Sequence, residues 1–351
     1  MAYDLSKKLV IGISSRALFD LEDEDDIFLK EGLAAYTKFQ IDNEKSILKP
    51  GTAFPLVRAF LNLNKKVPVE VVIMSRNNAS TSLRIFKSIE YHNLEITRSA
   101  WTGGNSIVPY LNPFKVDLFL SANETDVQQA INSNTAAGKI YNQEQPIDPV
   151  AQQIRIAFDG DAVLFSDEAE RIYQQDGMEA FFAHEKKNID QPLPDGPFAK
   201  LLKTISMTQK EFAVADAPIR TALVTARNSP AHERVIRTLN QWGVRIDEAF
   251  FLGGIEKQNV LKAFGAHIFF DDQDVHCARA ASVVPTARVP YRQISIPRVD
   301  AHLDLVPPHI EGYCFPTEEP FNPIQTDNSE HEAPAPELID VPAKDLNPTG
   351  P

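Results

Sequence analysis

Cysteine is nearly absent from this sequence. Its 351 residues include two cysteines, Cys277 and Cys314, which form neither a pairing framework nor a metal-binding spacing. Such usage is typical of a reducing compartment. The chain also lacks an apolar run of membrane-spanning length, and residues 1–8 contain no hydrophobic signal core. These absences argue against a disulfide scaffold and against a membrane partner, and we expect a cytoplasmic protein.

Positive charge is also in short supply. The 35 lysines and arginines are outnumbered by 48 aspartates and glutamates, which gives a formal net charge of −13. Because nucleic acids and anionic membranes attract basic surfaces, this balance argues against a nucleic-acid partner. The length allows two domains with a sizeable core, and apolar strands alternate with helical patterns, so we expect an α/β protein. The sequence leaves a homo-oligomer open.

Residues 154–168 carry the clearest chemical pattern. An apolar run at 154–158 ends in Asp159 and Asp161, with Gly160 between them. Buried strands of α/β sheets present ligand sites at their carboxyl ends. Two carboxylates this close repel each other unless a cation, a shared proton or a phosphoryl reaction uses them. The alternative is an ordinary surface turn, in which Asp-Gly pairs are common.

Three downstream features favour the chemical interpretation. Apolar runs at 221–224 and 267–270 end in polar residues, and a lysine follows a pair of glycines between them. The residues concerned are Thr225, Lys257, Asp271 and Asp272. The order strand–Asp-x-Asp, strand–Thr, Lys, strand–Asp-Asp resembles the haloacid dehalogenase superfamily of phosphotransferases. The resemblance implies a Rossmann-like parallel sheet, with residues 167–218 inserted as a small helical cap over the active site.

The chemistry of phosphate esters gives these residues expected roles. Asp159 is the expected nucleophile, which forms an aspartyl-phosphate, and Asp161 the expected acid and base. Mg²⁺ is the expected cofactor because it prefers hard oxygen ligands. Its expected ligands are Asp159, the backbone carbonyl of Asp161, Asp271 and Asp272. The expected substrate-binding residues are Thr225, Ala226, Arg227, Asn228 and Lys257, with His232 as a further candidate; we interpret His184 and His267 as surface or packing residues.

The same order of features occurs twice. Residues 14–17 precede residues 159–162 by 145 positions, Gly103-Gly104 precede Gly253-Gly254 by 150, and Arg76-Asn77 precede Arg227-Asn228 by 151. We therefore predict an N-terminal α/β domain at 1–141 that is an inactive copy, a linker at 142–153 and a catalytic domain at 154–295. Chance repetition within an α/β protein is the alternative.

The first copy lacks the chemical groups of the second. The residues that we align with Asp159, Asp161, Thr225, Lys257 and the Asp271-Asp272 pair are Ser14, Arg16, Met74, Ile107 and Ser121-Ala122. Its remaining polar strand ends suggest a regulatory site for an anion or a nucleotide, made by Ser14, Ser15, Arg16, Asn77, Gly103 and Gly104. Residues 316–351 are rich in proline and acidic residues, and we expect a disordered tail there.

Longer stretches narrow the resemblance to one family. Residues 157–168, 223–227 and 267–273 resemble the cytosolic 5′-nucleotidase I family, and residues 11–20 and 48–54 resemble its N-terminal half. This resemblance implies Mg²⁺-dependent removal of the 5′-phosphate from nucleoside monophosphates, with AMP favoured. Alternatives are a phosphatase for another small ester such as a sugar phosphate, a non-catalytic nucleotide sensor, and a scaffold that recruits partners through its acidic tail.

Overall fold

One mixed sheet of ten strands organises the chain, and we call residues 3–141 the first half and residues 153–293 the second half. The computed structural model describes residues 3–64, 66–141 and 153–293. The predicted tail at 316–351, and all but the last residue of the predicted linker at 142–153, lie outside these ranges. In the described ranges, no helix is both long and apolar enough to cross a membrane.

The two halves contribute five strands each. The first half supplies β1 (Leu9–Ile13), β2 (Val69–Ser75), β3 (Arg98–Trp101), β4 (Leu118–Ser121) and β5 (Ala136–Ile140). The second half supplies β6 (Ile154–Phe158), β7 (Ile219–Thr225), β8 (Glu248–Phe251), β9 (Ile268–Asp271) and β10 (Thr286–Arg288). Central strands such as β1 and β2 are buried along their whole length, as expected for parallel strands covered on both faces.

The strand order is the same in both halves. Across the sheet it reads β3-β2-β1-β4-β5-β10-β9-β6-β7-β8. From the outer edge to the centre, each half therefore places its third strand first, followed by its second, first, fourth and fifth strands. Neighbouring strands within each half are parallel, and β5 meets β10 in an antiparallel pair at the centre. The expected α/β fold with a largely parallel sheet is therefore confirmed.

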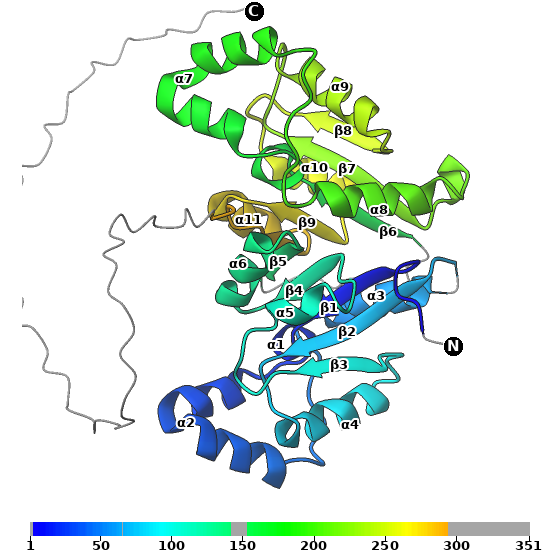
Figure 1. The fold of residues 1–351 in the computed structure, drawn as a ribbon, viewed down its shortest axis with the longest axis vertical. Helices are drawn as coiled ribbons and strands as arrows, with labels where there is room; N and C mark the ends of the chain where they lie inside the picture. Colours follow the sequence, from blue (N-terminus) through cyan, green and yellow to red (C-terminus); the bar gives the residue numbers. More distant parts are fainter. Residues whose placement is uncertain (1–2, 65, 142–152, 294–351) are drawn as a thin grey trace, which may run out of the picture. The chain divides into compact units, whose positions relative to one another are not determined.

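Helices connect these strands. The first half has α1 (Ser15–Leu18), α2 (Glu22–Asp42), α3 (Phe54–Leu63), α4 (Leu83–Tyr91), α5 (Val108–Leu111) and α6 (Glu124–Asn132). The second has α7 (Glu168–Lys187), α8 (Ala199–Gln209), α9 (His232–Trp242), α10 (Lys257–Phe264) and α11 (Asp274–Ala281). The predicted insertion at 167–218 contains α7 and α8. Figure 1 shows α2 and α7 as two bent helices toward opposite ends of the sheet. Each bends at a glycine with positive φ, Gly32 at 83° and Gly177 at 82°, a conformation that glycine adopts readily.

Individual hydrogen bonds recur between the halves. Arg84 Nε donates to the Ser46 carbonyl at 2.9 Å, and Arg234 Nε donates to the Gln191 carbonyl at 2.9 Å. A second matched pair joins the amide of Leu48 to Ser88 Oγ at 3.0 Å, and the amide of Leu193 to Thr238 Oγ1 at 2.9 Å. Each residue of the first half precedes its counterpart in the second half by 145 or 150 positions, the same spacing as in the sequence repeats.

One detail of the sequence alignment between halves is wrong by one residue. Ser75 pairs with Trp101 and Thr225 pairs with Phe251 in equivalent positions of the sheet. The amide of Asn77 donates to Ser75 Oγ at 3.2 Å, just as the amide of Arg227 donates to Thr225 Oγ1 at 3.2 Å. Ser75, and not Met74, therefore occupies the position of Thr225, and Asn77 that of Arg227. The shared Arg-Asn dipeptide suggested the other alignment, but strand register decides which side chains are equivalent.

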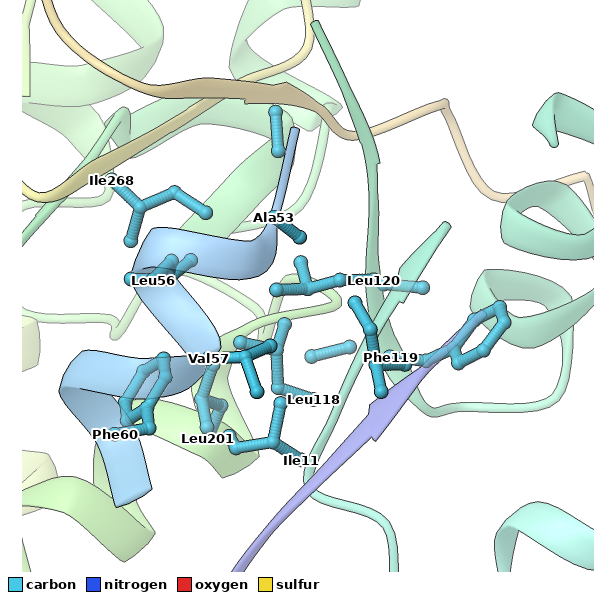
Figure 2. Close-up of a cluster of buried hydrophobic side chains, with 14 of the residues drawn as sticks. Ile11, Ala53, Leu56, Val57, Phe60, Leu118, Phe119, Leu120, Leu201 and Ile268 are labelled. Atoms are coloured by element: carbon cyan, nitrogen blue, oxygen red, sulfur yellow. The ribbon is translucent and has the colours of Figure 1, made fainter. Parts of the chain in front are cut away.

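The halves share a hydrophobic core. Val57 and Phe60 of α3 lie in one cluster with Ile11 of β1, and Leu201 of α8 and Ile268 of β9 reach the same cluster from the second half (Figure 2). Burying these side chains together stabilises both halves at once.

At the central seam, β5 and β10 approach closely. A Cβ on Gly138 would lie 2.8 Å from Ala287 Cβ and 3.2 Å from Phe270 Cε1. A glycine at 138 therefore permits the two halves to pair at this distance.

Candidate active site

Strand order explains why distant residues meet. β6 lies between β9 and β7, so the carboxyl ends of three neighbouring parallel strands present Asp159, Asp271 and Thr225. The chain order reverses between β6 and β9, and α/β sheets bind ligands at such a switch point. The predicted strand-end residues therefore come together at one edge of the sheet.

Lys257 connects two of the aspartates. It is the first residue of α10, 7% exposed, and its Nζ lies 2.9 Å from Asp159 Oδ1 and donates to Asp271 Oδ2 at 2.6 Å. Burial would lower the pKa of Lys257, but the charges of Asp159 and Asp271 outweigh burial and raise it. The Lys257 ammonium group therefore stays charged beside the Asp159 carboxylate.

Asp159, Asp271 and Asp272 form a buried carboxylate cluster. Each offers an oxygen within 4.8 Å of the others. Burial raises the pKa of Asp159 to about 7, with Lys257 opposing the shift and Asp271 adding to it. Burial and the charges of Asp159 and Asp271 raise the pKa of Asp272 to about 8. Burial would raise the pKa of Asp271, but Lys257 and His276 together outweigh burial and lower it. Two of the three carboxylates thus resist ionisation on their own, and all three offer hard oxygen ligands, which fits a divalent cation.

Asp161 lies outside that cluster and is held by Arg227. Arg227 donates from Nε and Nη2 to the two oxygens of Asp161, at 2.8 and 2.6 Å. Its Nη1 donates to Glu185 on α7, and Glu185 also accepts from Arg234 Nη1 at 2.8 Å. Burial would lower the pKa of Arg227, but Asp161 and Glu185 outweigh it and raise the pKa. The expected acid is therefore the end of a chain of alternating charges that reaches into the cap insertion.

The other predicted substrate-binding residues differ in how deeply they are buried. Thr225 is buried beside the aspartate turn, since a Cβ on Gly160 would lie 3.2 Å from Thr225 Oγ1. Ala226 and Asn228 are exposed directly after β7. Arg227 faces Asp161 and Glu185 in this structure, so its guanidinium already has partners.

Among the residues that the structure describes, the histidines stand apart from the carboxylate cluster, with one exception. His232 starts α9, and its ring lies edge-on to Phe251 with the centroids 5.7 Å apart. His184 contacts Glu185 at 3.4 Å, and His267 Nδ1 accepts from the Arg155 amide at 3.1 Å. His276 Nδ1, which sequence reasoning did not single out, lies 3.4 Å from Asp271 Oδ2.

Sequence reasoning missed further residues of the site. Glu185 and Arg234 complete the charged chain, and Tyr291 donates from its hydroxyl to Asp272 at 2.5 Å. The repeat offers a signal for Glu185, because Gln40 stands 145 positions earlier in the matching bent helix. Tyr291 follows the last strand, and no pattern around it indicates a contact with Asp272.

The predicted regulatory residues of the first half also come together. Ser14, Ser15, Arg16, Asn77, Gly103 and Gly104 all line one cavity of about 480 Å³ at the carboxyl ends of β1, β2 and β4. This edge corresponds to the edge that carries Asp159, Thr225 and Asp271 in the second half.

Comparisons with known proteins agree with the motif-based resemblance. A family model described as 5′-nucleotidase matches residues 1–295. The human protein named cytosolic 5′-nucleotidase 1B is 36% identical over 282 residues, which cover 76% of this chain and 46% of the human protein. The chain thus spans about half the length of this curated relative. A solved structure described as a universal stress protein from Pseudomonas aeruginosa UCBPP-PA14 covers 81% of this chain and 93% of its own, with 8% identity. Its TM-score of 0.30 is too low to carry an argument.

Proposed function

The chain belongs to the 5′-nucleotidase family, and we propose that it hydrolyses nucleoside 5′-monophosphates to nucleoside and inorganic phosphate, with AMP as the favoured substrate. The observation that carries this proposal is the buried Lys257 ammonium held between Asp159 and Asp271. It supplies positive charge next to a carboxylate that can act as a nucleophile, as phosphoryl transfer requires.

In the first step, an oxygen of Asp159 attacks phosphorus, and the bond from phosphorus to the 5′-oxygen breaks. Asp161 gives its proton to that leaving oxygen. In the second step, water attacks the phosphorus of the aspartyl-phosphate while Asp161 takes a proton from it. The bond from phosphorus to Asp159 breaks, so that phosphate leaves and both aspartates return to their starting states.

The carboxylate cluster fits a bound Mg²⁺. Asp159, Asp271 and Asp272 would hold it through carboxylate oxygens, with the backbone carbonyl of Asp161 as a further ligand. Bound Mg²⁺ would offset negative charge on the phosphoryl oxygens. Tyr291 orients Asp272 by donating to one of its oxygens.

Arg227 controls when Asp161 can act. Arg227 donates to both oxygens of Asp161, so Asp161 must separate from Arg227 before it can reach the leaving oxygen of a substrate. Glu185 retains a second bond to Arg227, which keeps the guanidinium near the site. A freed Nη2 or Nε then has a phosphoryl oxygen as its natural acceptor, and Thr225, Ala226 and Asn228 supply neighbouring contacts.

The first half is, in our interpretation, a copy of the same α/β unit that has lost catalysis. Ser14 and Arg16 stand at the positions of Asp159 and Asp161, and Ile107 stands at that of Lys257. The matching strand order and the repeated hydrogen bonds support this interpretation. We propose that the two copies extend over residues 1–141 and 154–295. The second half would act as the haloacid dehalogenase-like catalytic domain, with α7 and α8 as its cap.

A phosphate-release assay tests the function. The full chain should release phosphate from nucleoside monophosphates in Mg²⁺, more slowly from sugar phosphates, and not in excess chelator. Asp159→Asn should abolish release without unfolding the protein, because an amide cannot carry the phosphoryl group. Release by that variant at the wild-type rate would remove Asp159 as the nucleophile, and a preference for sugar phosphates would replace the proposed substrate class.

A further inference from the structure

The cavity of the first half has the size and lining of a small-molecule site. Its volume is about 480 Å³, within the usual range for ligand pockets, about 300–1,000 Å³. Apolar side chains from α2 and β2 line it together with uncharged polar side chains of the strand ends. Among them are Phe28, Leu33 and Tyr36 of α2, and Asn77 and Ser121 of the strand ends.

Charges in the cavity wall are already compensated. Arg16 lies 2.9 Å from Asp25, and Arg76 donates from Nε to Asp126 at 2.7 Å. The third acidic residue, Glu24, accepts from Arg84. In the described residues, each arginine of the lining is therefore paired with a carboxylate, which weakens its attraction for a phosphate.

Neutral side chains replace the charged chain of the second half. Asn77 occupies the position of Arg227, Gln40 that of Glu185, and Ile107 that of Lys257. The Tyr36 hydroxyl donates to Asn77 Oδ1 at 3.1 Å, which aims the amide. Asn77 Nδ2 is buried and has no hydrogen-bond partner in the described part of the chain. An unpaired buried donor is destabilising, and a ligand acceptor would remove that cost.

Aromatic surface completes the cavity. The Phe28 and Tyr36 rings meet edge to face with centroids 6.0 Å apart. Phe28 is 45% exposed and Leu33 60% exposed, so their apolar surfaces are open to a ligand. Planar rings bind favourably against such surfaces.

We propose that this cavity binds a neutral, planar heteroaromatic ligand of the nucleoside class, with its ring against Phe28 and a ring or carbonyl acceptor at Asn77 Nδ2. The choice of a nucleoside within this class rests on the proposed function, because hydrolysis of a nucleoside monophosphate releases one. The paired arginines disfavour a phosphorylated ligand, in contrast to the anion or nucleotide that the sequence suggested.

Calorimetric titration of the full chain with adenosine tests the proposal. Phe28→Ala and Asn77→Leu should each weaken one adenosine site by about tenfold or more, equivalent to about 1.4 kcal/mol. Leu29→Ala is the matched control, because Leu29 lies on the same helix, is 72% exposed and is not part of the cavity lining. Inorganic phosphate, as a second probe, should bind equally well to all four proteins.

Two results would overturn the proposal. One is an adenosine affinity that Phe28→Ala leaves at the level of the Leu29→Ala control; this test stands even if Asn77→Leu fails to fold. The other is phosphate binding that Arg76→Ala removes, which would make the cavity an anion site. Failure of the proposed function would appear instead as absent phosphate release from every substrate, a measurement that does not depend on adenosine binding at the first half.

Discussion

Replacing Glu185 with glutamine should lower both stability and turnover. Glu185 is 1% exposed and lies between two arginines whose side chains are 3% and 4% exposed, Arg227 and Arg234. Removing one member of a buried ion pair costs about 3–5 kcal/mol. Glutamine keeps the shape and one acceptor, so we expect the lower end, about 3 kcal/mol. At roughly 2–4 °C per kcal/mol for domains of this size, Tm should fall by roughly 6–12 °C.

Turnover should fall for a separate reason. Without Glu185, the guanidinium of Arg227 has Asp161 as its remaining carboxylate partner, so Asp161 is less free to leave Arg227 and reach the substrate. Loss of one charged hydrogen bond, about 1.5–3 kcal/mol, predicts a decrease in kcat of roughly tenfold or more. Steady-state phosphate release, at a temperature where the variant is folded, measures this decrease.

The first half supplies a matched control. Glu24 is 6% exposed and pairs with Arg84, which occupies the position of Arg234. Glu24→Gln should lower Tm by a similar amount and leave kcat unchanged. If the two variants lose turnover equally, Glu185 is a structural residue and its link to Asp161 through Arg227 has no catalytic consequence.

Three further predictions follow from the site and the seam. Asp161→Asn should lower kcat by about 10²-fold or more, and single-turnover phosphoryl transfer should suffer less with a good leaving group; equal losses would refute the acid role. In chelator, the free energy of unfolding should fall as pH rises from about 4 to about 8. The pKa is raised to about 7 for Asp159 and to about 8 for Asp272. In this pH range the folded state therefore binds more protons than the unfolded state, so each rise in pH favours unfolding. Tm measured against pH checks this, and Mg²⁺ should flatten the curve. Gly138→Ala should cost about 1–3 kcal/mol in chemical denaturation, because its Cβ would lie 2.8 Å from Ala287; an unchanged midpoint would show that the seam relaxes freely.

Sequence alone predicted the strand ends well. Asp159, Thr225 and Asp271 each end an apolar run, and parallel strands carry their carboxyl ends to one edge, so their meeting follows from the pattern. Lys257 was also predictable, since it follows a glycine pair at a fixed place in the motif order.

What the sequence could not give was side-chain pairing across elements. Glu185 is one acidic residue among several on a helix, and its burial depends on how the bend at Gly177 directs the second part of α7. Asn77 was aligned with the wrong residue because dipeptide identity carried more weight than strand register. The sequence likewise does not show that the arginines of the first cavity are paired; the structure pairs Arg16 with Asp25 and Arg76 with Asp126.

Two hydrogen bonds link the first half to the Asp272 carboxylate. Gln128 on α6 donates from Nε2 to the Tyr291 carbonyl at 2.9 Å, and the Tyr291 hydroxyl donates to Asp272 at 2.5 Å. The segment after β10 is therefore fixed between a helix of one half and a carboxylate of the other. β10 also pairs with β5. Removal of the first half would therefore expose the edge of β10 and also remove the hydrogen bond that holds Tyr291. If the first half is inactive, as we propose, its contacts with β10 and Tyr291 are a structural reason for its retention.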